Sequence, residues 1–269
     1  MKLKDTTRKN IIGYLEGFLQ GLVNKYDPDV VKNAVIKQVW LDPKKGKYKP
    51  FHTALLPPHF LRLHSFFRSF DTSLGQGVFE YIAQLIASDN TFWVKVERNY
   101  TLAIPTNNRI KESIATFIEN VKRKKERPYP PPPLPRLEPS SSEGQEILLR
   151  ADLYLEDKND KKYFFEIKSP EPNKDVCSQT KEKFLYFIAG IGPNGVYKFC
   201  FPYNPWGEEK VNYKWGFTLS LFDLNNEILI GKEFWDFIGG EGSYEAVLDV
   251  FREVGTTRGE ELLNKLIRK

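Results

Sequence analysis

Three side chains that could act on a phosphodiester lie in one segment, ILLRADLYLEDKNDKKYFFEIKSP, residues 147–170. Asp152 and Glu166 are carboxylates, which bind hard cations such as Mg²⁺ through oxygen. Lys168 follows Glu166 by two residues. It could hold or help to deprotonate an attacking water molecule and offset charge that grows on phosphorus. The residue types and their spacing therefore predict a metal-dependent nuclease centre.

Two strands must position these side chains. Successive side chains of a strand alternate between its faces, so Glu166 and Lys168 share one face. A three-residue loop, 158–160, would pair Asp152 with Glu166 across an antiparallel hairpin, because Asn and Asp tolerate the left-handed conformation that such loops need. The first strand has an apolar face formed by Ile147, Leu149, Ala151, Leu153 and Leu155. Asp152 is then expected on a polar, solvent-facing side, with Leu148, Arg150 and Tyr154.

A helix before the hairpin carries a further acidic candidate, Glu80. Polar and glycine-rich residues 71–77 open this helix, its apolar residues recur at helical spacing, and a strand is expected over 92–97. Two interpretations of Glu80 stay open. It is an auxiliary acid near the metal, or a solvent-facing glutamate of the first turn that complements the helix dipole.

Apolar spacing predicts a helix over 174–191, followed by a strand in VYKFCF. A helix between two strands normally places them parallel in one sheet. Lys181 and Lys183 would lie beside the hairpin, and Tyr203 and Asn204 would follow the second strand. Lys181, Tyr203 and Asn204 are candidate DNA contacts, although residues 203–207 could equally form a simple proline turn.

Charge is unevenly distributed along the chain. Residues 1–127 contain 22 Lys and Arg against 12 Asp and Glu, whereas residues 128–269 contain 18 against 23. A basic part could grip DNA phosphates while an acidic part binds metal. The candidate phosphate contacts are Lys44, Lys45, Lys47 and Lys49 in a loop, and Lys122, Arg123 and Lys124 at a helix end. A solubilising surface would explain the same residues.

The sequence suggests three parts. Residues 1–127 form a mainly helical basic part, whose helix over 9–26 is a core element or a dimer face. Residues 128–146 are a proline-rich spacer, and residues 147–269 are the catalytic core. No apolar run is long enough to span a membrane and residues 1–10 lack signal-peptide features, so a cytoplasmic protein without membrane association is expected.

The pattern Asp152, spacer, Glu166-Ile167-Lys168 resembles the PD-(D/E)XK nuclease superfamily, with Ala151 in place of the proline. Four segments are similar to the TdeIII-type group of type II restriction endonucleases, which includes the MjaII-like enzymes. They are SLGQGVFEYIAQLIA, the RADLYLED…YFFEIKSPEPN hairpin, FPYNPWG and GKEFWDFIGG. The likeness covers roughly residues 70–250.

This resemblance implies an α/β (α+β-like) fold with a restriction-endonuclease-like core, a mixed β-sheet flanked by helices. It implies Mg²⁺-dependent cleavage of double-stranded DNA by a homodimer at a short palindrome, GGNCC, with a partner methyltransferase. Asp152 and Glu166 would be metal ligands, Lys168 the water-positioning base, and Glu80 an auxiliary acid. Two other functions stay open: a structure-specific resolvase or repair nuclease, and a non-catalytic DNA-binding module.

Overall fold

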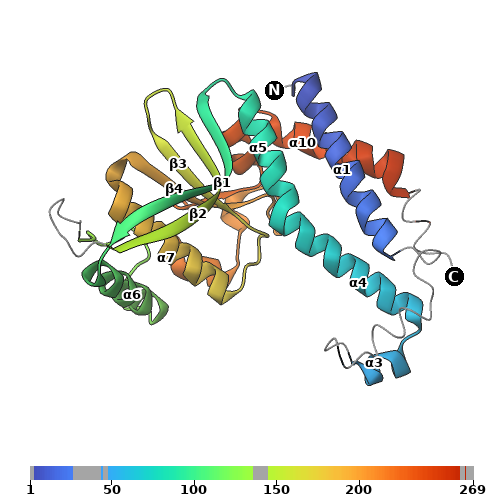
Figure 1. The fold of residues 1–269 in the computed structure, drawn as a ribbon, viewed down its shortest axis with the longest axis horizontal. Coiled ribbons are helices and arrows are strands. Elements are labelled where there is room, and N and C mark those ends of the chain that lie inside the picture. The colour runs from blue at the N-terminus through green and yellow to red at the C-terminus, as the bar shows by residue number, and fades with distance from the viewer. Residues whose placement is uncertain (1–2, 27–43, 45–47, 136–144, 261–263, 265–269) are drawn as a thin grey trace. The chain divides into compact units, whose positions relative to one another are not determined.

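A computed structural model describes residues 3–26, 44, 48–135, 145–260 and 264 (Figure 1). The chain divides into two compact units. One comprises Phe79–Tyr244, and the other comprises Leu3–Val78 together with residues 245–269. The candidate catalytic residues all belong to the first unit.

The first unit is built on a five-stranded sheet with the strand order β1-β2-β3-β4-β5. β1 (Trp93–Thr106), β2 (Gln145–Asp157) and β3 (Lys162–Ile167) are antiparallel neighbours. β4 (Gly195–Phe201) and β5 (Ile228–Ile230) continue the sheet in parallel. The mixed sheet and its parallel crossover, which the sequence predicted, are both confirmed.

Helices cover both faces of this sheet. Phe164 of β3 stacks on Phe187 of α7 (Lys174–Ile191), whereas the next residue, Phe165, contacts Phe237 of α9 (Lys232–Gly239). Because neighbouring strand residues face opposite sides, α7 and α9 lie on opposite faces. α5 (Phe79–Asp89) contacts α9, β1 and β2, and α6 (Asn108–Lys122) and α8 (Gly216–Leu221) contact α7.

The helix starts follow from local sequence. Asn107 precedes α6 and its side chain accepts the Ile110 N–H at 2.9 Å. Asn173 precedes α7 and accepts the Val176 N–H at 2.9 Å. Both are N-caps that satisfy backbone donors which have no partner within the helix. The observed α7 has the bounds predicted from its apolar spacing.

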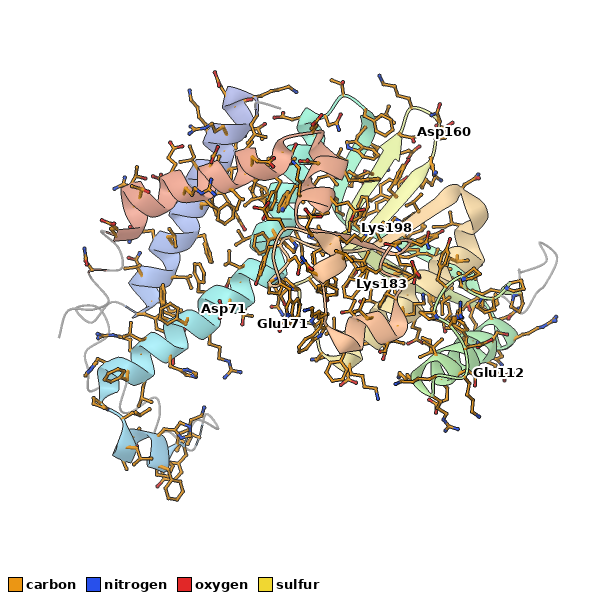
Figure 2. All side chains as sticks on the ribbon, turned by 180° about the vertical axis from the view of Figure 1, so that it is seen from behind. Asp71, Glu112, Asp160, Glu171, Lys183 and Lys198 are labelled. Atoms are coloured by element: carbon orange, nitrogen blue, oxygen red, sulfur yellow. The ribbon has the colours of Figure 1, made fainter. Side chains whose placement is uncertain are left out.

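The β2–β3 turn has the predicted three-residue loop. The backbone N–H of Asp157 donates to the carbonyl of Lys161 at 3.1 Å, which leaves residues 158–160 as the loop. Asp160 adopts the left-handed conformation, with φ of 57°. Figure 2 labels Asp160 at the tip of this hairpin.

The predicted alternation of faces along β2 is wrong near Asp152. Ala151 and Tyr154 belong to one apolar cluster, although residues three apart in a regular strand face opposite sides. The ring of Tyr100, which pairs with Ala151 in the ladder, stacks on that of Tyr154 with 4.2 Å between centroids. Tyr154 therefore lies on the core side and does not join a polar face.

A backbone irregularity accompanies this change of face. Asn99 has φ of 56° in the middle of β1, and the pairs on either side of it place it opposite Asp152. Left-handed conformation is unfavourable for residues with a Cβ atom, and asparagine tolerates it better than most. The two strands thus depart from regular geometry together, beside the candidate catalytic residue.

This conformation gives a stability prediction. We expect Asn99→Ala to lower the free energy of unfolding by less than the full left-handed cost of about 1–2 kcal/mol, because asparagine already bears part of that cost. Asn99→Gly should lose less, since glycine enters this region without a Cβ clash. Urea unfolding of both variants measures the difference. Equal stability of the two would show that Asn99 carries no left-handed penalty.

The boundaries of the two compact units differ from the boundaries that the sequence suggests. β1 and α6 come from the predicted N-terminal part, yet β1 pairs with β2 over most of its length and belongs to the same compact unit. Residues 128–135 run from α6 towards β2, and Leu134 packs against the apolar cluster of this unit. Proline content therefore marks a connection within one unit.

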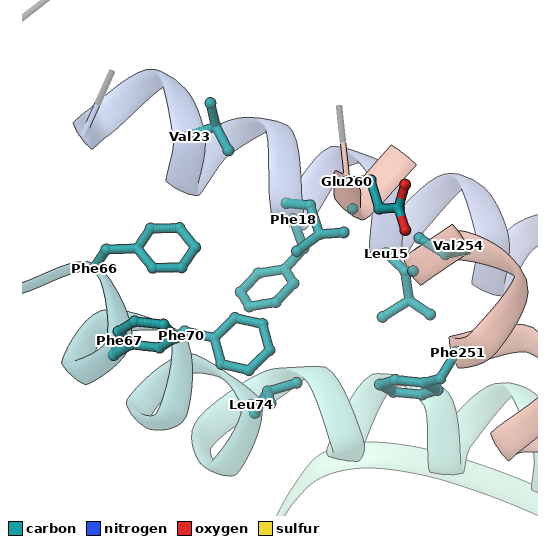
Figure 3. Close-up of a pocket in the computed structure, with 13 residues that line it drawn as sticks. Leu15, Phe18, Val23, Phe66, Phe67, Phe70, Leu74, Phe251, Val254 and Glu260 are labelled. Carbon is teal, nitrogen blue, oxygen red and sulfur yellow. The ribbon is translucent and has the colours of Figure 1, made fainter. Parts of the chain in front are cut away.

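The second unit packs helix α1 (Asp5–Tyr26) against α4 (Pro58–Ser73). The hydroxyl groups of Tyr26 and Ser69 lie 2.6 Å apart, and the ring of Phe66 packs against Leu22 and Val23. α10 (Ser243–Val254) contributes Phe251 and Val254 to an apolar cavity of about 290 Å³ in this unit (Figure 3). Glu260 is the one ionisable residue among the described residues that line it, so the cavity offers little polar chemistry.

Among the described helices, none combines the length and apolar character that a membrane span requires.

Candidate active site

The three catalytic candidates meet in the structure. The ammonium group of Lys168 donates to Oδ2 of Asp152 at 2.6 Å and lies 2.9 Å from Oε1 of Glu166. The two carboxylates therefore bind one ammonium group between them. The predicted convergence of these three residues is therefore present in the fold.

The way in which they meet differs from a regular ladder. Pairing of β2 with β3 ends at Leu153 and Phe165, one residue before Asp152 and Glu166. Beyond that point, Oδ2 of Asp152 accepts the backbone N–H of Ile167 at 2.8 Å. The Asp152 carboxylate thus replaces a backbone carbonyl as the acceptor for Ile167. It lies at the point where the pairing of β2 with β3 ends.

The expectation of a solvent-facing site is wrong. Asp152 is 3% exposed and Glu166 is 6% exposed. Burial of charged groups is costly unless they are paired, and the lysine provides that pairing.

Burial and mutual repulsion control the charges here. Burial, followed by the charge of Glu166, raises the pKa of Asp152. Burial alone would lower the pKa of Lys168, but the charges of Glu166 and Asp152 outweigh it and raise the pKa. Lys168 is consequently an ammonium group in this arrangement, and its positive charge offsets the two carboxylates.

Glu80 lies close to this centre, at the start of α5. Burial, followed by the charge of Asp152, raises the pKa of Glu80, and the charges of Lys168 and Glu166 also act on it. Its side chain is buried, which excludes the alternative of a solvent-facing glutamate. Glu80 adds a third acidic group, within electrostatic range of the other two.

A second lysine, Lys183 of α7, also reaches the centre. Its ammonium group donates to Oε2 of Glu166 at 2.6 Å. The sequence predicts that Lys181 and Lys183 both lie beside the hairpin. Helical spacing predicts that Lys181 faces the core, because it lies four residues after Cys177 and three before Phe184, both of which are buried.

The prediction that Lys181 contacts DNA is wrong. Lys181 is 1% exposed, pairs with Glu227, and donates to the Pro128 carbonyl at 2.9 Å. Burial lowers the pKa of Lys181, while the charge of Glu227 acts in the opposite direction. This lysine therefore holds the start of the proline-rich segment against α7.

Its role predicts a stability effect. Lys181→Met should lower the free energy of unfolding by about 3–5 kcal/mol, because it leaves Glu227 as a buried charge without its partner. The double variant Lys181→Met, Glu227→Gln should recover much of the loss, since no unpaired charge remains. Urea denaturation of the single and double variants provides the comparison. Additive losses would contradict a coupled pair.

The other candidate DNA contacts lie outside this cluster. Lys122, Arg123 and Lys124 are exposed at the end of α6, where Arg123 pairs with Glu119 at 2.6 Å. Tyr203 is 45% exposed. Asn204 has a structural role, because its side chain accepts the Trp206 N–H and donates to the Glu209 carbonyl. Lys44 is exposed and Lys49 is half-buried, whereas Lys45 and Lys47 lie outside the described residues.

The donor set fits a cation that takes few protein ligands. Across the described residues, no group of three or more His, Cys, Asp or Glu side chains is arranged to hold a metal ion. Mg²⁺ is commonly bound through one or two carboxylates, with waters and substrate phosphates completing its coordination. Asp152 and Glu166 supply that number.

Fold and site together define a class of protein. A mixed sheet whose antiparallel hairpin brings an aspartate, a glutamate and a lysine to one point is a restriction-endonuclease-like core. Within this class, residues 7–255 match the family model for the type II restriction endonuclease HinfI. The chain belongs to this family of type II restriction endonucleases, which are site-specific deoxyribonucleases.

Individual relatives agree with this assignment. The type II restriction enzymes HgiCII and HgiEI of Herpetosiphon aurantiacus are each 31% identical to the chain over 277 residues, covering 99% and 100% of it and the full length of each relative. MjaII of Methanocaldococcus jannaschii is 29% identical over 213 residues, 72% of this chain and 55% of that enzyme. No solved structure matches the chain significantly. The predicted resemblance to type II restriction endonucleases is thus confirmed.

Proposed function

We propose that the chain hydrolyses double-stranded DNA with Mg²⁺ at a short palindrome, with Asp152, Glu166 and Lys168 as its catalytic centre. The observation that carries this proposal is the Lys168 ammonium group within hydrogen-bonding distance of both carboxylates. Glu166 on β3 and Lys168 just after β3 lie fourteen and sixteen residues from Asp152 in sequence, yet all three meet in the fold. An arrangement that buries two acidic groups together is costly to fold, and a catalytic cation site accounts for it.

Each residue then has a distinct role. Asp152 and Glu166 would hold Mg²⁺, which supplies Lewis-acid stabilisation of charge on the phosphate. Lys168 holds the attacking water for in-line displacement and offsets the developing negative charge. The charges of the two carboxylates raise the pKa of Lys168, so Lys168 must lose a proton before it can act as a base. Glu80 would act as an auxiliary acid.

A digestion experiment tests this function. The purified chain should cut phage DNA into discrete fragments with Mg²⁺ and should fail to cut it with EDTA. Mapping the ends gives the recognition site, for which the family resemblance implies GGNCC. Four duplexes that differ only in the central base pair of this site would show whether the enzyme accepts every base pair at that position. Absence of any Mg²⁺-dependent cleavage would overturn the proposal.

The same experiment separates the other two functions. A resolvase or repair nuclease would cut branched or damaged substrates in preference to linear duplexes and would leave no common sequence at the ends. A non-catalytic module would bind DNA without cutting it.

Further proposals concern the partners. A palindromic site suits a homodimer, because two-fold symmetry in the protein matches two-fold symmetry in the DNA. A methyltransferase that modifies the same site would protect the host DNA, without a stable complex. Lys44, Lys45, Lys47, Lys49, Lys122, Arg123, Lys124 and Tyr203 remain candidate DNA contacts.

The α6 end permits a direct test of phosphate gripping. The triple variant Lys122→Gln, Arg123→Gln, Lys124→Gln should weaken binding to all sequences alike. It should also flatten the slope of log K against log salt by about 0.9 for each phosphate that the variant no longer neutralises. The Arg123–Glu119 pair is exposed on both sides and so costs little to break.

Arg252→Gln is a matched control for this variant, since Arg252 is similarly exposed and pairs with Asp249 at 2.8 Å. It lies on α10 and should leave the salt slope unchanged. An unchanged slope in the triple variant would show that the α6 end is only a solubilising surface.

A further inference from the structure

The two oxygens of Glu166 are held by two different lysines. Oε1 lies 2.9 Å from the ammonium group of Lys168, and Oε2 accepts from Lys183 at 2.6 Å. Lys168 also contacts Asp152, so Oε1 is the Glu166 oxygen that binds the ammonium group shared by the two carboxylates. Lys183 therefore has a place in the centre that differs from that of Lys168, because it contacts Glu166 on the other oxygen.

Rigid elements present both partners of this contact. Glu166 lies in the parallel ladder of β3 with β4, where it pairs with Phe199. Phe184 and Phe187, one and four residues after Lys183 on α7, are buried, and the buried Lys181 binds Glu227. α7 is also shown against the sheet in Figure 1, and Figure 2 labels Lys183. A contact between two fixed elements restricts rotation of the carboxylate more than a contact with a surface lysine would.

We infer that Lys183 is a positioning residue that orients Glu166 for cation binding. By holding Oε2, it leaves Oε1 directed towards the position that the Lys168 ammonium group now occupies beside Asp152, where the two carboxylates can bind one cation. This inference rests on the proposed function, because it assigns Lys183 a role at that same centre. Partners that orient metal ligands in this way typically contribute about 10- to 100-fold to metal affinity or activity.

Charge balance alone makes the opposite prediction. If Lys183 served only to offset negative charge, its removal would leave the carboxylates more negative and cation binding would tighten. If Lys183 orients Glu166, its removal frees the carboxylate to rotate and cation binding weakens. The sign of the change in Mg²⁺ affinity therefore discriminates between the two roles.

The experiment compares the full-length chain with Lys183→Met, Lys183→Arg and Lys174→Met. Lys174 is an exposed lysine on the same helix and controls for loss of a positive charge from α7. Mg²⁺ binding without DNA is measured by isothermal titration, folding by circular dichroism, and cleavage by single-turnover assay across Mg²⁺ concentrations.

We expect Lys183→Met to weaken Mg²⁺ binding by about 10- to 100-fold. Lys183→Arg, which keeps charge and donors, should recover most of that loss, and Lys174→Met should match the parent. Mg²⁺ binding by Lys183→Met that equals or exceeds that of a parent which cleaves DNA overturns the inference and leaves the proposed function standing. A parent that neither binds Mg²⁺ nor cuts DNA overturns both.

Discussion

Asp152→Asn and Glu166→Gln are each expected to abolish Mg²⁺-dependent cleavage while DNA binding persists. Each removes one of the two carboxylates that would hold the cation, and the Lewis-acid contribution is worth several kcal/mol. Since about 1.4 kcal/mol corresponds to tenfold in rate, the loss should be on the order of 10³-fold or more. Single-turnover cleavage and gel-shift binding measure the two effects separately.

Both substitutions should leave the chain folded. In Asp152→Asn, the amide oxygen of the asparagine can still accept the hydrogen bond from the Ile167 N–H, because this bond does not require a charged acceptor. Neutralising one of three neighbouring acidic groups also relieves the cost of a buried charge and its repulsion, since burial, followed by the charge of Glu166, raises the pKa of Asp152 in the parent. Stability should therefore change less than activity.

Asp157→Asn is the matched control. Asp157 is a buried carboxylate on the same strand, 3% exposed, but its Oδ1 accepts the N–H groups of Asn159 and Lys161 at the hairpin turn, and its Oδ2 accepts the Tyr163 hydroxyl. An amide nitrogen cannot accept that hydroxyl, so Asp157→Asn should cost stability without changing the Mg²⁺ dependence of cleavage. Unimpaired cleavage in either Asp152→Asn or Glu166→Gln would remove these residues from the active site.

The hairpin that carries the site could be predicted from sequence because its signals are local. Alternation in the segment around Glu166 and a three-residue loop ending at Asp160 set the register, and that register brings Asp152 to Glu166. The same holds for α7, whose apolar spacing and Asn173 cap define its extent. Such features depend on neighbours within a few residues.

β1 shows where local signals fail. The sequence predicts a strand over 92–97, yet β1 continues to Thr106 through Asn99 and Pro105. Both residues disfavour strands, but β1 is an edge strand, where proline is tolerated, and its pairing with β2 supplies the stabilisation. Tertiary pairing outweighs intrinsic preference here, and no short segment contains that information.

The lysines of α7 illustrate a second limit. Lys181 and Lys183 have the same chemistry and are two residues apart, but one pairs with Glu227 in the core and the other with Glu166 in the site. Their carboxylate partners lie 46 and 17 residues away in sequence. Helical spacing indicates which lysine faces the core, whereas the identity of each partner depends on the folded sheet.

Lys168→Met is expected to slow cleavage by about 10²- to 10⁴-fold, the usual contribution of a positioned proton-transfer group. Lys168→Arg should recover little of this rate. An arginine keeps the positive charge but cannot lose its proton in a protein, and its planar group does not reproduce a compact ammonium. Single-turnover rates at saturating Mg²⁺ measure the effect on chemistry, and full activity in Lys168→Arg would assign Lys168 a purely electrostatic role.

The same variant, Lys168→Met, should respond more strongly to Mg²⁺ as a stabilising ligand. In the parent, the Lys168 ammonium group already offsets the charges of Asp152 and Glu166. Without it, these buried carboxylates depend on a bound cation, and at a given concentration a ligand that binds only the folded state raises stability more when it binds more tightly. We therefore expect Mg²⁺ to raise the Tm of Lys168→Met by more than it raises that of the parent. An equal rise in both proteins would show that Lys168 and the cation do not interact with the same carboxylates.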